Sequence, residues 1–232
     1  MKVFLRMCVV AAAVVASIGA IRIARAGDEG SDLRESKAVF QELMSSPDHQ
    51  IPDALLDRAR CIVVIPHELK GAVGIGAQTG EGVMSCRTAS GWSAPVFVSM
   101  KGGSWGAQVG VEKTELVLFF MTERGARSLV EGDKVKLGGE LSVAAGPFGR
   151  TAEASTDLKL NAEIYSYAKS KGLFAGASLS GATLHMDKED NAAYYGKNFS
   201  SKSLLKGEAN VEMKPEAQDF ISVLPMGRHA ER

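Results

Sequence analysis

The sequence contains few aromatic residues and carries no net charge. Aromatic side chains occupy 6% of its 232 positions, and 27 Lys and Arg residues balance 27 Asp and Glu residues, so the formal net charge is zero. A nucleic-acid-binding protein usually shows a basic excess, and few aromatic rings leave little on which bases could stack. With 45% hydrophobic and 23% charged residues, the composition is that of an ordinary globular protein. We therefore expect no nucleic acid among its partners.

Ligand patterns for metals and nucleotides are also missing. The sequence holds three cysteines and four histidines, without a CxxC or HExxH pattern or a histidine pair at positions i and i+4. Zinc sites need more closely spaced ligands than these. The glycine-rich stretch GAVGIGAQTG at 71–80 lacks the Gly-Lys-Ser/Thr ending of a phosphate-binding loop, and a turn and a strand pattern follow it rather than a helix. We expect no metal and no other cofactor.

Long apolar runs are absent except near the N-terminus. There the basic start MKVFLR precedes an apolar run at 7–16, and the motif Ala-Arg-Ala at 24–26 offers the small residues that a signal peptidase reads. The run is well short of the roughly 20 residues of a membrane-spanning helix, although a retained anchor is the alternative. We predict a signal peptide at 1–26, cleaved before Gly27. The protein would then be exported to the periplasm, where peripheral association with a membrane is an option.

Cleavage would change both the charge and the cysteine content. Removal of four basic residues leaves 23 basic against 27 acidic side chains, so any attraction to an anionic membrane must come from a local patch. Two cysteines remain, Cys61 and Cys86. In an oxidising compartment they could form a disulfide worth roughly 3 kcal/mol. Both lie in apolar, strand-like segments, so buried free thiols are the alternative.

Hydrophobic periodicity predicts helices at the start of the chain and strands after them. The segment 31–44 has the pattern of an amphipathic helix, and a second, short helix is expected from Pro52. Glycine-containing turns are predicted at 79–81, 90–91 and 101–103. The expected strands are 61–65, 72–78, 82–87, 94–100, 104–111, 116–121, 139–145, 150–158, 163–168, 173–179 and 182–186. The other expected helices are 122–130, 187–195, 200–206 and 215–224.

These elements define the predicted fold class. Short strands with tight turns favour an α+β fold with a mainly antiparallel β-sheet, barrel- or sandwich-like, with N-terminal amphipathic helices and short C-terminal helices. No long Ser/Pro/Gly linker interrupts the sequence. We therefore predict a single domain over 27–232, with its core at about 31–224.

One motif suggests catalysis. The sequence GGSWG around Ser104 matches the G-x-S-x-G nucleophile elbow, and Asp133 or Asp157 and then His185 follow in the chain order of α/β hydrolases. The elbow needs a strand that turns sharply into a helix, whereas 107–111 continues the strand pattern. A serine hydrolase that uses Ser104 is therefore an alternative to a protein without enzymatic activity. A small outer-membrane barrel, suggested by the glycine-rich alternating strands, is a second alternative.

Five blocks of sequence resemble the SYLF domain family in the family's order: CIVVIPHELKGAVGIGAQTGEGVM (61–84), GWSAPVFVSMKGGSWGAQVG (91–110), LGGELSVAAGPFGR (137–150), IYSYAKSKGLFAGASLSG (164–181) and NAAYYG (191–196). The resemblance covers about residues 31–224 and implies a lipid-binding module without enzymatic activity. Eukaryotic members bind phosphoinositides, partly through an N-terminal amphipathic helix, and some bind and bundle actin. Some family members carry a lipidation cysteine, an SH3 module or a zinc-finger module. We identify none of these features in this sequence. We do not transfer actin binding, because an exported protein would not meet cytoplasmic actin in its own cell.

The helix at 31–44 is the predicted membrane contact. Its apolar stripe and basic edge would let aliphatic side chains enter the lipid while long basic side chains reach phosphate groups. The alternative is that the same stripe packs on the sheet as core. The candidate residues of this helix are Leu33, Arg34, Lys37, Phe40, Leu43 and Met44.

A basic turn is a further candidate for lipid contact. Lys169 and Lys171 flank Ser170 just before the apolar sequence GLF, and together with Lys101 they could meet lipid headgroups. An ordinary solvated hairpin is the alternative. The expected partner is a phospholipid or an anionic membrane surface.

Overall fold

The structure is a computed structural model that describes residues 29–45, 51–148, 161–170, 173–176, 179, 181–196 and 198–226. The predicted signal peptide and the predicted strand at 150–158 lie outside these residues. The described strands are β1 (Cys61–Thr88), β2 (Gly91–Trp92), β3 (Val96–Phe120), β4 (Lys134–Lys136), β5 (Val143–Ala145), β6 (Ile164–Ser170), β7 (Leu173–Gly176) and β8 (Ala182–Met186). The described helices are α2 (Glu29–Ser45), α3 (Asp53–Arg58), α4 (Glu123–Gly132), α6 (Lys188–Tyr195), α7 (Ser201–Leu205) and α8 (Pro215–Ser222).

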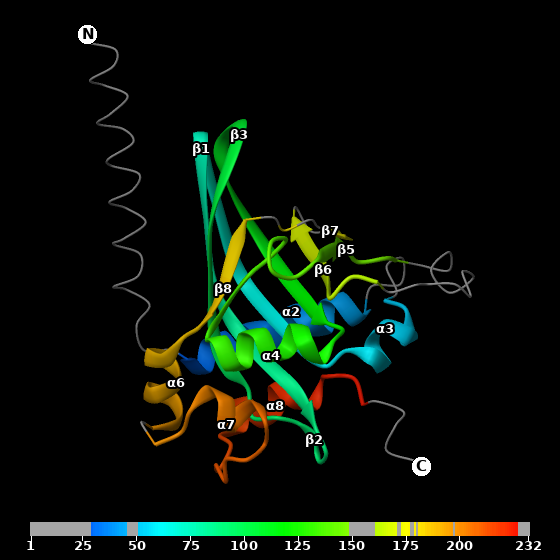
Figure 1. Cartoon of the computed structure of the whole chain (residues 1–232), viewed down its shortest axis with the longest axis vertical. Helices are drawn as coiled ribbons and strands as arrows, with labels where there is room; N and C mark the ends of the chain where they lie inside the picture. The colour runs from blue at the N-terminus through cyan, green and yellow to red at the C-terminus, as the bar shows by residue number, and fades with distance from the viewer. Residues whose placement is uncertain are drawn as a thin grey trace.

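The predicted fold class is confirmed. The strands form a mainly antiparallel sheet that curls into a half-barrel, and the helices lie around it (Figure 1). Only β5 and β6 pair in parallel within the described part of the sheet. The N-terminal helix α2 and the short C-terminal helices α6, α7 and α8 occupy the places that the sequence predicts.

A long two-stranded ribbon is the centre of the fold. Strands β1 and β3 pair antiparallel along nearly their whole length, from Cys61 opposite Phe120 to Met84 opposite Val96. The ribbon rises to one end of the molecule and bends there (Figure 1). Its two halves therefore return to the same region, which brings the start of β1 next to the end of the same strand.

Glycine makes this return possible. A Cβ atom on Gly82 would lie 2.0 Å from the carbonyl oxygen of Val64, and one on Gly80 would lie 2.7 Å from the Ile65 side chain. No residue with a side chain fits at such distances. These two glycines therefore lie where the first half of β1 passes close to its second half.

The predicted turns at 79–81 and 101–103 are wrong. Both segments continue as strand within β1 and β3. The predicted turn at 90–91 does occur, and it joins the end of β1 to β2. A glycine permits both a tight turn and a close backbone crossing, and the neighbouring sequence does not distinguish the two. The predicted short strands from 61 to 121 are therefore pieces of two long ones.

The remaining strands attach to the two halves of β3. Strand β8 pairs with its first half at Val98–Gly102, and β4 adds to the other edge of β8. Strand β6 pairs with the second half of β3 at Glu115–Phe120, and β5 and β7 pair with β6. The three-residue strand β4 was not predicted, because its sequence KVK is too short to show a strand pattern.

Apolar side chains fill both faces of the ribbon. The run Cys61–Ile65 is fully buried, as predicted for a strand covered on both sides. Ile62 and Val64 pack toward the side covered by α2, α3 and α8, whereas Val63 and Ile65 pack toward the inside of the curled sheet with residues of α4 and α7. The sheet therefore has two apolar cores.

Local sequence explains the ends of several helices. The Thr122 side chain accepts a hydrogen bond from the backbone N–H of Gly125 and caps α4, and Asp187 accepts from two backbone N–H groups at the start of α6. Asp187 is thus the N-cap of α6. No helix among the described residues is long and apolar enough to cross a bilayer.

Cys61 and Cys86 form a disulfide, which settles the choice between a bridge and free thiols. The two cysteines stand near opposite ends of β1, and the backbone N–H of Arg87 donates to the carbonyl of Arg60 beside them. The bond therefore joins the two ends of the folded ribbon.

Candidate functional site

The apolar stripe of α2 packs on the sheet. Leu33, Phe40 and Leu43 are fully buried in the core, where the Phe40 ring lies 6.4 Å from that of Phe119. Met44, at the end of the helix, is 40% exposed. In the described structure the apolar stripe of α2 is therefore part of the core, which was the alternative to membrane contact. Lipid could reach Leu33, Phe40 and Leu43 only if α2 left the sheet.

The basic candidates next to α2 are mostly held by carboxylates. Lys37 pairs with Asp219 of α8 at 3.3 Å, and Lys169 of β6 pairs with Glu42 of α2 at 2.6 Å and with Glu115 of β3 at 3.3 Å. Burial alone would lower the pKa of Lys169, but its hydrogen bonds to these carboxylates outweigh burial and raise it. Arg34 is exposed, and Lys171 lies outside the described residues.

Lys101, by contrast, belongs to a row of polar side chains across four strands. Thr183 of β8 stands opposite both Lys101 of β3 and Lys136 of β4, and Lys101 stands opposite Thr79 of β1. Directly opposed residues point to the same face of a sheet. Because the alternate residues of β8 are buried in the core, this row points outward.

A second row lies beside it on the same face. His185 of β8 stands opposite Ser99 of β3 and Lys134 of β4, and Glu81 of β1 stands opposite Ser99 at the far end. Burial lowers the pKa of His185, and the nearby Lys101 and Lys134 lower it further, so the imidazole is neutral at pH 7. We call the basic face the set Thr79, Lys101, Thr183, Lys136, Ser99, His185 and Lys134.

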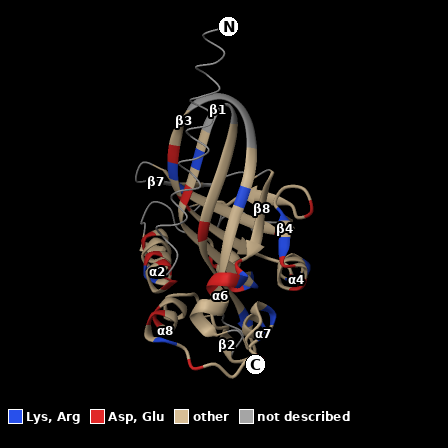
Figure 2. Cartoon of the chain, turned by 90° about the vertical axis from the view of Figure 1, so that its left-hand side faces the viewer, with Lys and Arg blue, Asp and Glu red and all other residues tan. Residues whose placement is uncertain are grey.

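The lysines of the basic face differ from most others that the structure describes, because they have no acidic partner among the described residues. Lys101, Lys134 and Lys136 are exposed, and within the described part of the chain no carboxylate pairs with their ammonium groups. In Figure 2, blue stretches of ribbon, which mark Lys or Arg, are visible beside β8 and on β4, and the red of Asp and Glu on α6 lies below them. Lysines that do have carboxylate partners are Lys37, Lys70, Lys169, Lys188 and Lys206. An unpaired cluster of cations on one face attracts anions.

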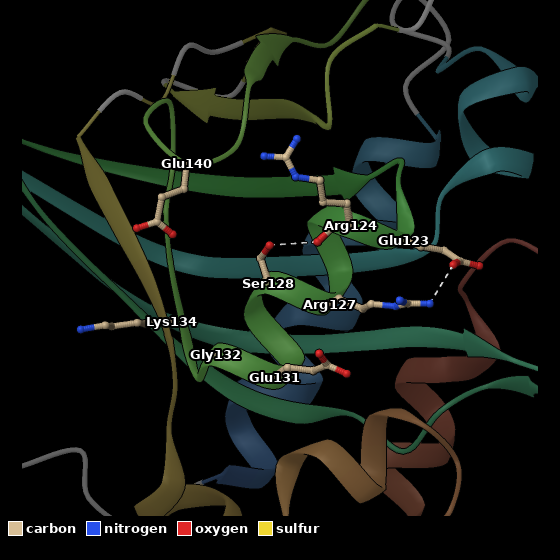
Figure 3. Close-up of a pocket in the computed structure, with 8 residues that line it drawn as sticks. All are labelled: Glu123, Arg124, Arg127, Ser128, Glu131, Gly132, Lys134 and Glu140. Atoms are coloured by element: carbon tan, nitrogen blue, oxygen red, sulfur yellow. Dashed lines mark hydrogen bonds and ion pairs between the residues drawn. The ribbon is translucent and has the colours of Figure 1, made fainter.

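A surface hollow next to α4 adjoins this face. It is lined by Glu123, Arg124, Arg127, Ser128, Glu131, Gly132, Lys134 and Glu140 (Figure 3). Its three cations match its three carboxylates in number, and Arg127 pairs with Glu123 at 3.3 Å. Lys134 points away from α4, toward the side of β8. A hollow lined by charged side chains does not suit acyl chains, which need apolar walls.

The hydrolase alternative lacks its defining geometry. The backbone around Ser104 is continuous strand within β3, so it forms no strand-to-helix turn. Asp133 caps the end of α4 and pairs with Lys188 at 2.6 Å, and His185 lies between two lysine-bearing strands. Asp157 is outside the described residues. Among the described residues, no group of three or more His, Cys, Asp or Glu side chains could hold a metal.

Sequence reasoning found Lys101 but missed Lys134, Lys136 and Thr183 as its neighbours. Lys101 and Lys136 are far apart in the sequence, and only the insertion of β8 between β3 and β4 brings them together. Polar and apolar residues alternate in KVK at 134–136 and in ATLHM at 182–186. In a strand, this alternation places the polar residues of both segments on the outward face, where they form the two rows. This arrangement becomes visible only once both segments are known to be strands.

The protein has an α+β fold, and its backbone at Ser104 does not form the turn of a nucleophile elbow. Comparison with known protein families shows to which family it belongs. Residues 101–226, more than half of the chain, match the Ysc84 family, described as Las17-binding protein actin regulator. The chain therefore belongs to the Ysc84 family, which confirms the resemblance to SYLF proteins.

Individual relatives support the same assignment. Over 180 residues, which are 76% of this chain, the sequence is 38% identical to Protein YSC84 of Saccharomyces cerevisiae, of which the match covers 38%. LAS seventeen-binding protein 3 of the same species is also 38% identical over 180 residues, with 39% of its length covered. The human SH3 domain-containing YSC84-like protein 1 is 32% identical over 188 residues, covering 80% of this chain and 54% of the relative. The chain thus spans from about two fifths to just over half of the length of these relatives, and none of the three names is that of an enzyme.

Proposed function

We propose that this protein is a non-catalytic phospholipid-binding module that acts at an anionic membrane surface. The basic face carries the proposal, because three exposed lysines there have no carboxylate partner among the described residues. Each lysine close to an anionic surface contributes about 1 kcal/mol. Without the first 26 residues the chain has more acidic than basic side chains, so a local patch of this kind is what attraction to such a surface requires.

The basic face also explains how binding could occur without unfolding. Insertion of the α2 stripe would remove Leu33, Phe40 and Leu43 from the core and break the ion pair between Lys169 and Glu42. Contact through the basic face needs no such change, because its lysines are already exposed. We therefore place the first contact with the membrane on the basic face. Arg34 and Met44 are the exposed candidates on α2.

Flotation with vesicles tests this function. We expect the protein to bind vesicles that contain phosphatidylglycerol, to bind less in high salt and to ignore vesicles of phosphatidylcholine alone. The double variant Lys101→Glu/Lys136→Glu should bind about 30-fold more weakly or worse, from the loss of two cations at about 1 kcal/mol each. Phe40→Asp is not a useful variant, because it would bury an unpaired carboxylate in the core.

The control for this experiment makes the same change in charge elsewhere. Lys113 of β3 and Lys202 of α7 are also exposed and lie outside the basic face, so Lys113→Glu/Lys202→Glu alters the net charge equally. If both double variants lose binding to the same extent, net charge and not the basic face is responsible. If the unaltered protein floats with no anionic vesicle, the proposed function is wrong.

Partners named for relatives are not assigned to this chain. The Las17 binding in the family description and in a yeast relative's name belongs to proteins of which this chain matches about two fifths. We further propose that residues 1–26 direct export and that the protein works in the periplasm. An exported protein would not meet cytoplasmic actin, so we propose no activity on actin.

The mass of the protein after expression in a bacterial host tests the export. We expect the periplasmic fraction to contain a form that begins at Gly27, because the Ala-Arg-Ala motif at 24–26 supplies the residues that signal peptidase reads. A variant with Ala24→Phe/Ala26→Phe should keep the leader uncut. An intact N-terminus on unaltered protein, found only in the cytoplasmic fraction, would contradict the proposal.

A further inference from the structure

The basic face lies next to a group of carboxylates on the same side of the molecule. Strand β8 ends at Met186, and the next residue, Asp187, is the N-cap of α6. The ion pair between Lys188 of α6 and Asp133, the residue before Lys134, holds the helix beside β4. In Figure 2 the red of α6 lies below the blue stretches beside β8 and on β4. This side of the molecule is therefore basic at one end and acidic at the other.

Carboxylates from three elements meet at the acidic end. We call the acidic cluster the set Glu29 at the start of α2, Glu81 of β1, and Asp187, Glu189 and Asp190 of α6. Burial and the charges of the other four carboxylates raise the pKa of Asp190 to about 6. Such a shift arises because ionisation next to like charges is unfavourable. Glu189 is exposed and the other members are half-buried, so the cluster faces the solvent.

We infer that two copies of this chain associate face to face through this surface. A dimer with a two-fold axis brings the same patch of both copies together, so the patch must be complementary to itself. An axis between the two charged ends lays the basic face of each copy on the acidic cluster of the other. Lys101, Lys134 and Lys136 then gain the carboxylate partners that they lack among the described residues.

A second copy is the partner that uses both ends of the surface. An acidic partner of another kind would match the basic face and leave the acidic cluster without a role. Self-association would also regulate the proposed function, on which this consequence rests. The dimer hides the basic face, so only the monomer can bring its lysines to an anionic membrane.

Sedimentation velocity in the absence of lipid tests the inference. We expect the purified protein to dimerise at low salt and to dissociate at high salt, because salt screens exposed charges. Two charge-reversed variants, Lys101→Glu/Lys136→Glu and Glu29→Lys/Glu189→Lys, remove the complementarity from opposite ends of the surface. Each should raise the dissociation constant of the dimer at least roughly ten-fold, since the two-fold axis makes every substitution count twice.

Mixing the two charge-reversed variants tests the arrangement directly. The first variant is acidic at both ends and the second is basic at both ends, so each repels itself and complements the other. An equimolar mixture should sediment as a heterodimer, which would also show that both variants are folded. A mixture that stays monomeric, or unaltered protein that is monomeric at low salt, would overturn the inference. Equal dissociation of the control Lys113→Glu/Lys202→Glu would overturn it too, because net charge would then be responsible.

The outcomes separate the inference from the proposed function. A monomeric protein that binds anionic vesicles would overturn the inference and leave the proposed function standing. A charge-dependent dimer that binds no anionic vesicle would do the reverse. If both occur, energy transfer between labelled copies should disappear when phosphatidylglycerol vesicles are added. Transfer that persists in vesicle-bound protein would show that the dimer does not hide the basic face, and would overturn the proposed regulation.

Discussion

Alanine in place of Gly82 should destabilise the protein by about 3 kcal/mol or more, or prevent folding. The new Cβ would lie 2.0 Å from the carbonyl oxygen of Val64 and 2.8 Å from the Cα atom of Ile65. Both are backbone atoms in the first half of β1, so the clash cannot be relieved by a side-chain rotation. The two halves of the folded ribbon would have to separate, which removes packing from the core. Urea unfolding followed by circular dichroism measures the loss.

Gly103→Ala is the matched control. Gly103 lies in β3, the strand paired with β1, but the nearest atom to a Cβ at this position would be the Gly76 carbonyl oxygen at 3.9 Å. Its substitution should change the free energy of unfolding by no more than about 0.5 kcal/mol. If Gly82→Ala and Gly103→Ala unfold at the same urea concentration as the unaltered protein, the two halves of the ribbon do not cross as described.

Reduction of the disulfide should lower the free energy of unfolding by about 3.5 kcal/mol. Cys61 and Cys86 are 25 residues apart, and opening a loop of that length returns this much conformational entropy to the unfolded chain. The folded state loses its covalent link between the two ends of β1 at the same time. The urea midpoint measured with and without a phosphine reductant gives the effect.

A variant without the two thiols shows whether the reductant acts through the bridge. Cys61→Ala/Cys86→Ala should unfold at one midpoint whether or not the reductant is present. Should the unaltered protein also be insensitive, and should both its thiols react with a labelling reagent after unfolding without reductant, the disulfide is not formed. Disulfides persist in oxidising compartments, so its presence in purified protein would support the proposed export.

The helices were predictable because the forces that set their ends act over a few residues. Thr122 and Asp187 supply hydrogen-bond acceptors directly before α4 and α6, and the apolar spacing of α2 repeats along its own sequence. The strands were predictable as extended segments, but their lengths were not. A turn was expected at Gly80, but this glycine lies within β1. The first half of the same strand passes close to it.

The candidate site was predictable only in part. Lys101 was identified from sequence, whereas the lysines next to it on β4 depend on strand order, which no local pattern contains. Lys169 was also identified from sequence, as a candidate for contact with lipid headgroups. In the structure its ammonium group instead forms ion pairs within the protein, with carboxylates of α2 and β3.

The sequence by itself determined the family, the α+β class and the positions of the helices, because blocks of residues and short-range periodicity carry that information. The tertiary structure decided that the apolar stripe of α2 faces the sheet, that β1 folds back on itself and that unpaired lysines of β3 and β4 share one face. Each of these depends on contacts between segments far apart in the chain. Side chains acquire neighbours of that kind only when the polypeptide folds.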